Sequence, residues 1–355
     1  MKLKVGILGA TGAVGQKFVR LLENHPWFEI SALAASSRSA GKAYHDAAHW
    51  IESTPIPIGI SEMIVQEARP GLDCDFVFSG LDSSVAGDIE SDFATAGYPV
   101  ISNAKNFRME ADVPLIIPEV NPDHLILIER QKWEGGGYIV TNPNCATVGL
   151  TLALKPIEDA FGIEAVSVVT LQALSGAGYP GVSSLDSLGN VVPFISGEED
   201  KLATEPLKLL GDVSEDGIAD RSFPISAQCT RVPVMDGHLE CVSVKLRRKG
   251  TAKQLEKVLR DFQSPDLVRD LPSSPEQAIL VLDEEDGPQP RKHVLTGGGM
   301  TVTIGRIRPC EILDVKMVVL SHNTIRGAAG GAILNAELLA SKGLIPHREE
   351  LASSA

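Results

Sequence analysis

The residue with the clearest chemical potential in this sequence is a cysteine, Cys145, in the segment TNPNCAT at positions 141–147. A β-rich run at 138–140 precedes this segment, and a stretch with helical spacing at 148–161 follows it. The free N–H groups at the start of a helix stabilise a thiolate and can also hold an oxyanion. We therefore predict that Cys145 is a nucleophile. The other cysteines lie in or beside apolar runs and are interpreted as inert buried thiols: Cys74, Cys229, Cys241 and Cys310.

A nucleophilic cysteine needs a base that removes its proton and later manages protons on the intermediate. The segment RVPVMDGH at 231–238 precedes a predicted strand, and Gly237 suggests a turn that presents His238. His238 is therefore the candidate base, with a hydrogen-bonded turn histidine as the alternative. Other histidines stand in contexts that suggest the protein surface, such as His25 in Asn-His-Pro and His124 in Asp-His-Leu.

A glycine-rich segment, GATGAVG at 9–15, lies between a predicted strand and a predicted helix. Glycines in such a turn let the backbone approach a pyrophosphate, and the helix N-terminus favours its negative charge. The spacing G-x-x-G-x-x-G differs from the commoner dinucleotide motif, so a plain tight turn is the alternative. We predict dinucleotide binding here.

The turn after the second predicted strand indicates which dinucleotide is bound. An acidic residue at this turn would accept hydrogen bonds from the ribose of NAD, whereas hydroxyls and arginine accommodate the extra phosphate of NADP. The sequence has Ser36, Ser37 and Arg38 here and no acid. NADP is therefore the predicted cofactor, and an ordinary solvated loop is the alternative.

Composition excludes several other classes of function. Asp plus Glu number 46 and Lys plus Arg 32, which gives a formal net charge of −14 and argues against a nucleic-acid partner. Five cysteines without C-x-x-C spacing fit a reducing compartment, so we expect a cytoplasmic protein. Neither a zinc site nor a G-x-S-x-G serine nucleophile is supported. No window approaches 18 uninterrupted apolar residues, so no membrane span is predicted.

The order of predicted elements indicates the fold class. At 355 residues the chain is expected to form two domains. Before Cys145, short apolar runs alternate with helical stretches, which predicts a parallel sheet covered on both faces. After Cys145, longer β-rich runs with fewer helices predict an α+β domain with a mixed or antiparallel sheet. The segment 324–341 carries one apolar stripe at helical spacing and is predicted to be the last helix.

Four motifs in this order, GATGAVG, NPNCAT, LQALSGAG and RVPVMDGH, resemble the aspartate-semialdehyde dehydrogenase family, particularly its archaeal and fungal branch. The resemblance covers nearly the whole chain. It implies an α/β protein with a Rossmann-type dinucleotide-binding domain at 1–144 plus 324–355. Residues 145–323 would form an α+β catalytic and dimerisation domain with a mixed sheet. A homodimer or homotetramer is expected.

The resemblance also implies a reaction. Aspartyl phosphate would be reduced by NADPH through a thioester on Cys145, in the biosynthesis of lysine, methionine and threonine. His238 would be the acid/base, Gln172 would orient the acyl group, and Arg231 would bind the substrate α-carboxylate. From the residues alone, Gln172 only ends a predicted strand before a glycine-rich loop, a common place for ligand contact.

Other substrate roles carried over from the family concern two further segments. Glu205 would bind the substrate ammonium and Lys208 the phosphate, while Asn103 and Arg108 would form the other phosphate-binding segment. Pro206 follows Glu205 and removes an amide donor, so a solvated helix face stays the alternative for Glu205 and Lys208.

The cofactor residues implied by the family fall in five segments. They are Gly9, Thr11, Gly12, Ala13 and Val14 in the phosphate loop, Ser36, Ser37 and Arg38 in the selecting turn, Gly80 after the fourth strand, Ser175 and Gly176 near the nicotinamide, and Asn323 at its carboxamide.

Three alternatives remain at this point. A malonyl-CoA reductase paralogue would use the same thioester chemistry but would leave Glu205 without an ammonium partner. An N-acetyl-glutamyl-phosphate reductase usually has a different cysteine motif. A non-enzymatic NADP-sensing Rossmann regulator would need a partner-binding module, and no such segment is evident.

Overall fold

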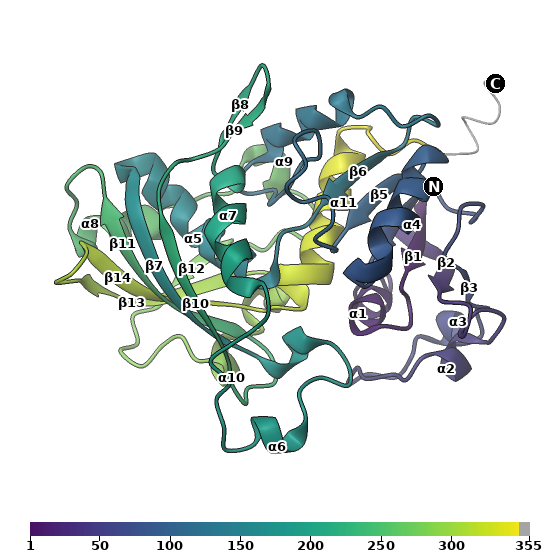
Figure 1. Ribbon diagram of the computed structural model, residues 1–355, viewed down its shortest axis with the longest axis horizontal. Helices are drawn as coiled ribbons and strands as arrows, with labels where there is room; N and C mark the ends of the chain where they lie inside the picture. Colours follow the sequence, from purple (N-terminus) through teal and green to yellow (C-terminus); the bar gives the residue numbers. More distant parts are fainter. Residues whose placement is uncertain (348–355) are drawn as a thin grey trace. The chain divides into compact units, whose positions relative to one another are not determined.

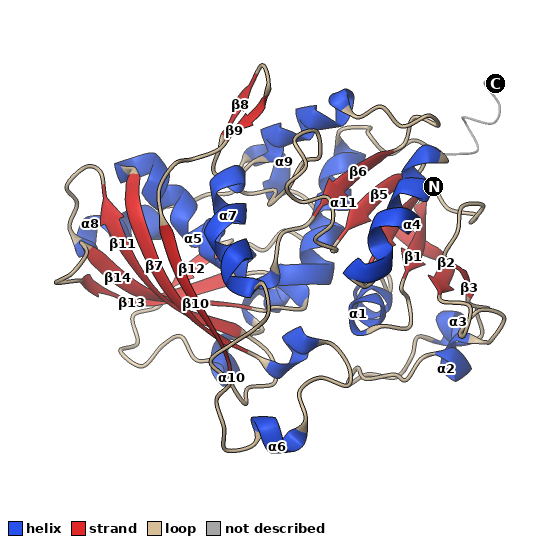
Figure 2. Cartoon of the chain, viewed as in Figure 1, coloured by secondary structure: helices blue, strands red, loops and turns tan. Residues whose placement is uncertain are grey.

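The computed structural model describes residues 1–347 (Figures 1 and 2). The chain forms two compact units. The first contains Met1–Ile116, Asp123–Asn142 and the described residues from Ala329 onward, and the second contains Ile117–Pro122 and Pro143–Ala328.

The first unit is built on a six-stranded sheet in the order β3-β2-β1-β4-β5-β6, with every pair parallel. Its strands are β1 (Leu3–Leu8), β2 (Phe28–Ala35), β3 (Gln66–Glu67), β4 (Phe76–Ser79), β5 (Pro99–Ser102) and β6 (Tyr138–Thr141). This is the strand order of the dinucleotide-binding Rossmann fold, in which the order of the strands reverses between β1 and β4. Ligands bind such sheets beyond the carboxyl ends of the strands at this reversal.

Helices of the first unit follow from local sequence signals. They are α1 (Ala13–Leu21), α2 (Tyr44–Ala47), α3 (Ile58–Ser61), α4 (Ser83–Thr95), the 3-10 segment η1 (Pro122–Arg130) at its boundary, and α11 (Gly330–Ser341). Asp82 caps α4 by accepting a hydrogen bond from the N–H of Ser84 at 2.9 Å, as expected for an aspartate at this position. The local pattern therefore fixes where α4 begins.

The last helix differs from its sequence prediction. The segment predicted as one helix at 324–341 begins with a π-helical turn, η4 (Ile325–Ala329), and continues as α11. One apolar stripe predicts one buried face, but every residue of α11 from Gly330 to Leu339 is buried. The helix lies within the core of its unit and contacts β5, so the single-stripe prediction is wrong.

The second unit is built on a mixed six-stranded sheet in the order β10-β7-β11-β14-β13-β12. The two outer pairs are parallel and the three inner pairs are antiparallel. Its strands are β7 (Ile163–Gln172), β10 (Ile225–Arg231), β11 (His238–Leu246), β12 (Ile279–Val281), β13 (Val302–Pro309) and β14 (Val315–Ser321). The mixed sheet predicted for this half of the chain is confirmed.

Figure 2 shows the helices of the second unit in blue and its strands in red. The helices are α5 (Cys145–Phe161), η2 (Leu174–Ala177), α6 (Ser184–Ser187), α7 (Glu198–Leu209), α8 (Ala252–Arg260), α9 (Asp266–Arg269), α10 (Pro290–His293) and η3 (Thr296–Gly299). α5 contacts β7, β11, β13 and β14 as well as α7 and α8. A small hairpin, β8 (Asp212–Ser214) with β9 (Gly217–Ala219), stands out from the unit in Figure 1. The sequence did not predict this hairpin or β10.

Candidate active site

Cys145 is the first residue of α5, so its sulfur lies at a helix N-terminus. Asn144 caps the helix, and its side-chain Oδ1 accepts hydrogen bonds from the N–H groups of Ala146 at 3.0 Å and Thr147 at 3.4 Å. The N-cap thus orders the first turn, whose positive dipole end favours a negatively charged sulfur. The helix begins at the cysteine itself, three residues before the predicted helical stretch.

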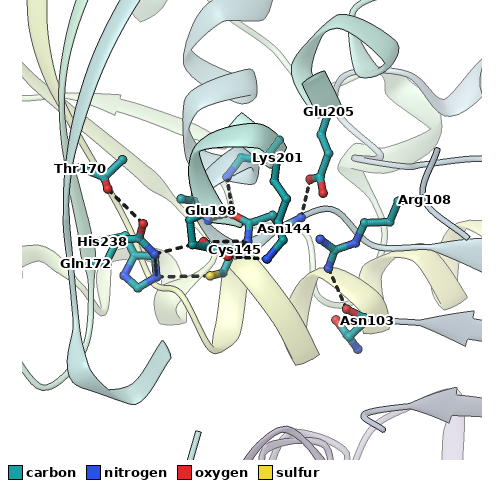
Figure 3. A network of polar contacts seen from close by, with 12 residues as sticks. Asn103, Arg108, Asn144, Cys145, Thr170, Gln172, Glu198, Lys201, Glu205 and His238 are labelled. Carbon is teal, nitrogen blue, oxygen red and sulfur yellow. Dashed lines mark hydrogen bonds and ion pairs between the residues drawn. The ribbon is translucent and has the colours of Figure 1, made fainter. Parts of the chain in front are cut away.

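His238 lies against this sulfur, with 3.2 Å between its Nε2 and Cys145 Sγ (Figure 3). Its other ring nitrogen, Nδ1, accepts a hydrogen bond from the Ala173 N–H at 3.1 Å. A ring nitrogen that accepts a hydrogen bond carries no proton, so a neutral imidazole here has its proton on Nε2. This N–H then donates to Sγ and stabilises the thiolate.

The imidazole of His238 is held neutral by its surroundings. The side chain is fully buried, and burial together with the positive charge of Arg231 lowers its pKa to about 3. Glu198 acts in the opposite direction but does not compensate. At neutral pH His238 is therefore a neutral imidazole whose Nε2–H can donate a hydrogen bond to Cys145 Sγ.

Three site residues meet because their strands end side by side. Gln172 ends β7 and Arg231 ends β10, and the two residues are paired across this parallel ladder. His238 begins β11, which runs antiparallel to β7 and pairs Leu239 with Leu171. Three segments distant in sequence thus place their polar side chains at one edge of the mixed sheet.

Arg231 is buried, and its guanidinium Nη1 donates to the Ala173 carbonyl at 2.6 Å. Burial lowers the pKa of Arg231, and the nearby Cys145 and Glu198 oppose this shift. Gly176 lies against the same group, since a Cβ there would be 3.0 Å from Arg231 Nη1 and 3.0 Å from His238 Cε1. A side chain at this position would therefore force Arg231 or His238 to shift.

Glu205 and Lys208 lie on α7, and both side chains are buried. Glu205 Oε2 accepts a hydrogen bond from the Asn144 N–H at 2.7 Å, next to the nucleophile. Pro206 does not break the helix, which continues to Leu209. The alternative of a solvated helix face for these two residues is wrong. Their roles toward substrate stay predictions.

Sequence reasoning missed several residues of this site. Asn144 is the helix cap, Glu198 accepts hydrogen bonds from Asn144 and Gln172, and Gly327 packs against the nucleophile. A Cβ at Gly327 would lie 2.8 Å from both Cα and Cβ of Cys145. An asparagine directly before a predicted helix is a capping signal that could have been used, but nothing local marks Glu198 or Gly327.

Another buried carboxyl, Glu240, lies two residues after His238 on the same strand. Its side chain is fully buried, and neither carboxyl oxygen has a hydrogen-bond partner among the described residues. Burial raises its pKa well above the ordinary value. The folded protein therefore keeps a proton here that the unfolded chain releases as the pH rises above about 4.5.

Replacing Glu240 with glutamine tests this proton. The wild-type protein should lose stability relative to Glu240→Gln as the pH rises from 5 to 8, by at most about 1.4 kcal/mol per pH unit, because only the wild type must retain a proton to stay folded. Urea unfolding across this range measures the difference. Glu164→Gln is the control, because Glu164 is an exposed carboxylate on β7. If the free energies of unfolding of wild type and Glu240→Gln changed in parallel between pH 5 and pH 8, the carboxyl would already be ionised in the folded protein at pH 5.

In the first unit, Asn103 and Arg108 lie in the segment after β5. Arg108 is buried, and its Nη2 donates to the Asn103 carbonyl at 2.7 Å. The Asn103 side chain bonds to Asn142 Nδ2 at 3.1 Å and contacts the Ser79 carbonyl at 3.3 Å. The structure therefore brings Asn103 and Arg108 together.

The glycine segment after β1 is suited to a dinucleotide phosphate. Gly9 has φ +76, and a Cβ there would lie 2.8 Å from the Gly80 carbonyl oxygen, so the loops after β1 and β4 touch at the reversal of strand order. Gly12 is the N-cap of α1 and supplies no side-chain cap to the first turn. The loop that contains Gly9, Thr11 and Gly12 thus leads into the first turn of α1, where the N–H groups of Ala13 and Val14 can bind a phosphate.

The turn after β2 contains Ser36, Ser37 and Arg38, all exposed, and no acidic side chain. In the second unit, Asn323 Nδ2 donates to Ser175 Oγ at 2.8 Å, and its Oδ1 accepts from the Gly237 N–H at 2.9 Å. Asn323 thereby joins the loop after β7 to the turn that presents His238.

Some predictions about buried and exposed side chains are wrong. His25 and His124 are buried, not at the surface, and His25 Nε2 lies 2.8 Å from Glu337 Oε1. Cys241 is exposed, whereas Cys229 is buried with its pKa raised by burial to about 11. The residues that neighbour a histidine or cysteine in the sequence do not determine whether its side chain is buried in the folded protein.

Within residues 1–347, no group of three or more His, Cys, Asp or Glu side chains could hold a metal ion. None of the helices in this range is both long and apolar enough to cross a bilayer.

Comparison with known families covers both units. Residues 4–128 match the semialdehyde dehydrogenase NAD binding domain, and residues 154–326 match the semialdehyde dehydrogenase dimerisation domain. These matches confirm the predicted fold class, a Rossmann-type domain followed by a dimerisation domain with a mixed sheet.

Similar proteins cover almost the whole chain. Aspartate-semialdehyde dehydrogenase of Candida albicans is 50% identical over 96% of this chain and 99% of its own length. The enzyme of the same name from Archaeoglobus fulgidus is 49% identical over 97% of this chain and all of its own. A crystal structure of the Candida albicans enzyme with NADP matches with a TM-score of 0.90, at 48% identity, over 97% of this chain and all of that one. The chain therefore belongs to the aspartate-semialdehyde dehydrogenase family.

Proposed function

We propose that this protein is an NADP-dependent aspartate-semialdehyde dehydrogenase, which converts L-aspartyl 4-phosphate to L-aspartate 4-semialdehyde and phosphate. The reaction belongs to the biosynthesis of lysine, methionine and threonine. The observation that carries the proposal is the 3.2 Å contact between Cys145 Sγ and His238 Nε2 at the start of α5. Family membership supplies the substrate class.

In the first half of the reaction, the Cys145 thiolate attacks the β-carbonyl carbon of the aspartyl phosphate. The C–S bond forms and the carbonyl electrons move to oxygen, where helix N–H groups and the Gln172 amide stabilise the oxyanion. Collapse of this adduct breaks the C–O bond to phosphate, which leaves. An acyl-thioester on Cys145 remains.

The second half releases the product from sulfur. NADPH, when bound at the loop containing Gly9 and the turn containing Arg38, supplies the hydride that reduces the acyl group. Hydride addition leaves an oxyanion on the carbon that is bonded to the Cys145 sulfur. The electrons of this oxyanion form the carbonyl of the aldehyde again as the C–S bond breaks and the sulfur leaves as thiolate. The Nε2–H of His238 donates a hydrogen bond to the oxyanion and then to the departing sulfur, so the thiolate and the neutral imidazole are restored.

Substrate recognition is assigned to individual polar side chains. Arg231 binds the α-carboxylate, and Glu205 binds the ammonium. Lys208 binds the phosphate, and Asn103 with Arg108 form the other phosphate-binding segment. Malonyl-CoA has no ammonium group, so the buried Glu205 favours aspartate over the malonyl-CoA reductase alternative.

The remaining assignments concern domain boundaries, oligomeric state and cellular compartment. In this proposal residues 1–144 and 324–355 belong to the cofactor domain, and residues 145–323 form the catalytic and dimerisation domain. Residues 348–355 of the first assignment lie outside the described part of the chain. The match to a dimerisation domain supports a homo-oligomer, and we favour a dimer or tetramer in the cytoplasm.

Phosphate-dependent reduction of NADP by the purified protein with aspartate semialdehyde tests the function. Activity with this aldehyde and none with malonyl-CoA and NADPH is the expected pattern. Turnover of malonyl-CoA alone would assign the protein to the paralogue, and NADP binding without turnover of either would indicate a regulator.

Replacing Arg231 with lysine should raise KM for aspartate semialdehyde roughly ten- to a hundredfold, with a smaller change in kcat. A single ammonium group cannot replace the two parallel hydrogen bonds of a guanidinium to a carboxylate. Steady-state kinetics measure the effect. Arg248→Lys is the control, because Arg248 is exposed and donates to the Ala160 carbonyl. An unchanged KM for Arg231→Lys would remove this residue from the substrate site.

A further inference from the structure

Glu198 is the first residue of α7 and is buried with 7% of its surface exposed. None of the substrate roles proposed above uses it. In Figure 3 its carboxylate lies between the Asn144 side chain and Gln172, close to Cys145 and His238. A carboxylate in this position must have charged or polar partners to remain buried.

The Glu198 carboxylate accepts hydrogen bonds from two amides beside the nucleophile and from a lysine on its own helix. Asn144 Nδ2 lies 3.0 Å from Oε1 and 2.9 Å from Oε2. Gln172 Nε2 donates to Oε2 at 3.3 Å, and Lys201 Nζ lies 2.5 Å from Oε1. Burial alone would raise the pKa of Glu198, but Lys201 and these hydrogen bonds lower it below the ordinary value. The group is therefore an anion that only accepts hydrogen bonds.

An acceptor-only carboxylate determines which way each amide side chain points. Asn144 must turn its Nδ2 toward Glu198, which leaves its Oδ1 for the N–H groups of the first turn of α5. Gln172 must likewise turn its Nε2 toward Glu198, while its Oε1 accepts from Thr170 Oγ1 at 3.0 Å. One carboxylate thus sets the orientation of both amides.

The orientation of Gln172 matters for chemistry at the sulfur. Its Nε2 lies 3.3 Å from His238 Nε2. Because that imidazole nitrogen already carries the proton donated to sulfur, the contact is not a hydrogen bond. The second hydrogen of the amide is therefore available to the oxygen of an acyl group on Cys145. A reversed amide would present a carbonyl oxygen and repel that oxyanion.

We infer that Glu198 is a positioning residue, which holds the amides of Asn144 and Gln172 so that the helix cap and an N–H donor both face Cys145. This inference rests on the proposed thioester reaction. The Glu198 carboxylate accepts hydrogen bonds from Asn144 and Gln172, so its positioning effect passes through these two amides. Its charge also raises the pKa of His238, which is a separate and direct effect.

Replacement by glutamine keeps the shape of the Glu198 side chain but puts an NH2 group where one carboxylate oxygen was. This new donor would face the donors of Asn144, Gln172 and Lys201. Either Asn144 or Gln172 must then turn around or lose its partner. Glu198→Gln should lower kcat for semialdehyde oxidation roughly ten- to a hundredfold with a smaller change in KM, since the lost donor acts on the adduct. Asp200→Asn is the control, because Asp200 carries the same charge in the same helical turn and is exposed. It should keep wild-type kcat.

A double-mutant cycle with Gln172→Ala separates positioning from general structural support. If Glu198 acts through Gln172, the effect of Glu198→Gln on kcat should shrink to about threefold or less in the Gln172→Ala background. An equal effect in both backgrounds would overturn the inference, as would a wild-type kcat in Glu198→Gln. Should Glu198→Gln lose its fold by circular dichroism, Glu198→Asp replaces it in the cycle, because aspartate keeps two acceptor oxygens but shortens their reach.

Alkylation of Cys145 by iodoacetamide gives a readout that needs no substrate. Reversal of the Asn144 amide would weaken the cap of α5, so Glu198→Gln should slow alkylation at pH 7 several-fold and shift its pH profile upward. An unchanged profile would remove the Asn144 part of the inference. Failure of the proposed function is separately visible, because the wild-type protein itself would then not reduce NADP.

Discussion

Replacing Cys145 with serine is expected to lower kcat at least about a thousandfold while NADPH binds as tightly as before. A serine hydroxyl at this position is not ionised near neutral pH, and the neutral imidazole of His238, with its proton on Nε2, cannot take the hydroxyl proton. Single-turnover reduction of NADP measures the chemical step, and quenching of protein fluorescence by NADPH measures cofactor binding.

Cys241→Ser is the matched control for this experiment, because Cys241 is an exposed thiol on β11. It should react at the wild-type rate. Near-normal turnover in Cys145→Ser would refute the thioester. Loss of NADPH binding together with activity would point instead to a collapsed fold.

Replacing His238 with asparagine is expected to lower kcat roughly 10²- to 10⁴-fold. The asparagine Oδ1 can still accept the Ala173 N–H, so the local backbone should be kept while the Nε2 proton is lost. The thiolate then loses its 3.2 Å hydrogen-bond partner. Steady-state kinetics with aspartate semialdehyde, NADP and phosphate measure this loss.

His293→Asn provides the comparison for this variant, because His293 Nδ1 also accepts a backbone N–H, from Gln289 at 2.9 Å. It should leave kcat unchanged. If His238→Asn kept kcat within about threefold of wild type, the imidazole would have no part in stabilising the thiolate or the oxyanion, and the Cys145 contact would be structural only.

The first unit could be predicted from its sequence because its signals are local. The strand β1, the glycines from Gly9 and the helix α1 follow one another within 21 residues. Alternation of such units limits the fold to a parallel sheet. The sequence did not indicate that Gly9 and Gly80 are in contact, because this contact depends on β1 and β4 being neighbours in the sheet.

The second unit was predicted less completely, because its site depends on pairing between distant strands. Cys145 and His238 are separated by 93 positions, and Gln172 and His238 by 66. Nothing in the local pattern places the end of β7 beside the start of β11. The family resemblance supplied these residues, while the residues alone left His238 as one of two alternatives.

Two of the buried groups that the sequence did not indicate are carboxylates. Glu198 and Glu240 are carboxylates that usually lie at the surface, and their burial becomes evident only when α7 and α5 pack on the mixed sheet. His25 was misplaced for the same reason, since its polar neighbour Asn24 suggested a surface turn. Tertiary packing can bury a polar residue in any local context.

The thioester mechanism requires a covalent acyl group at Cys145. The protein should be mixed with aspartate semialdehyde and NADP in the absence of phosphate, quenched in acid, and analysed by mass spectrometry of its peptides. We predict an aspartyl adduct on the peptide containing Cys145, formed in step with one equivalent of NADPH and discharged when phosphate is added. A burst of NADPH with the adduct on another residue, or with no adduct, would contradict the account.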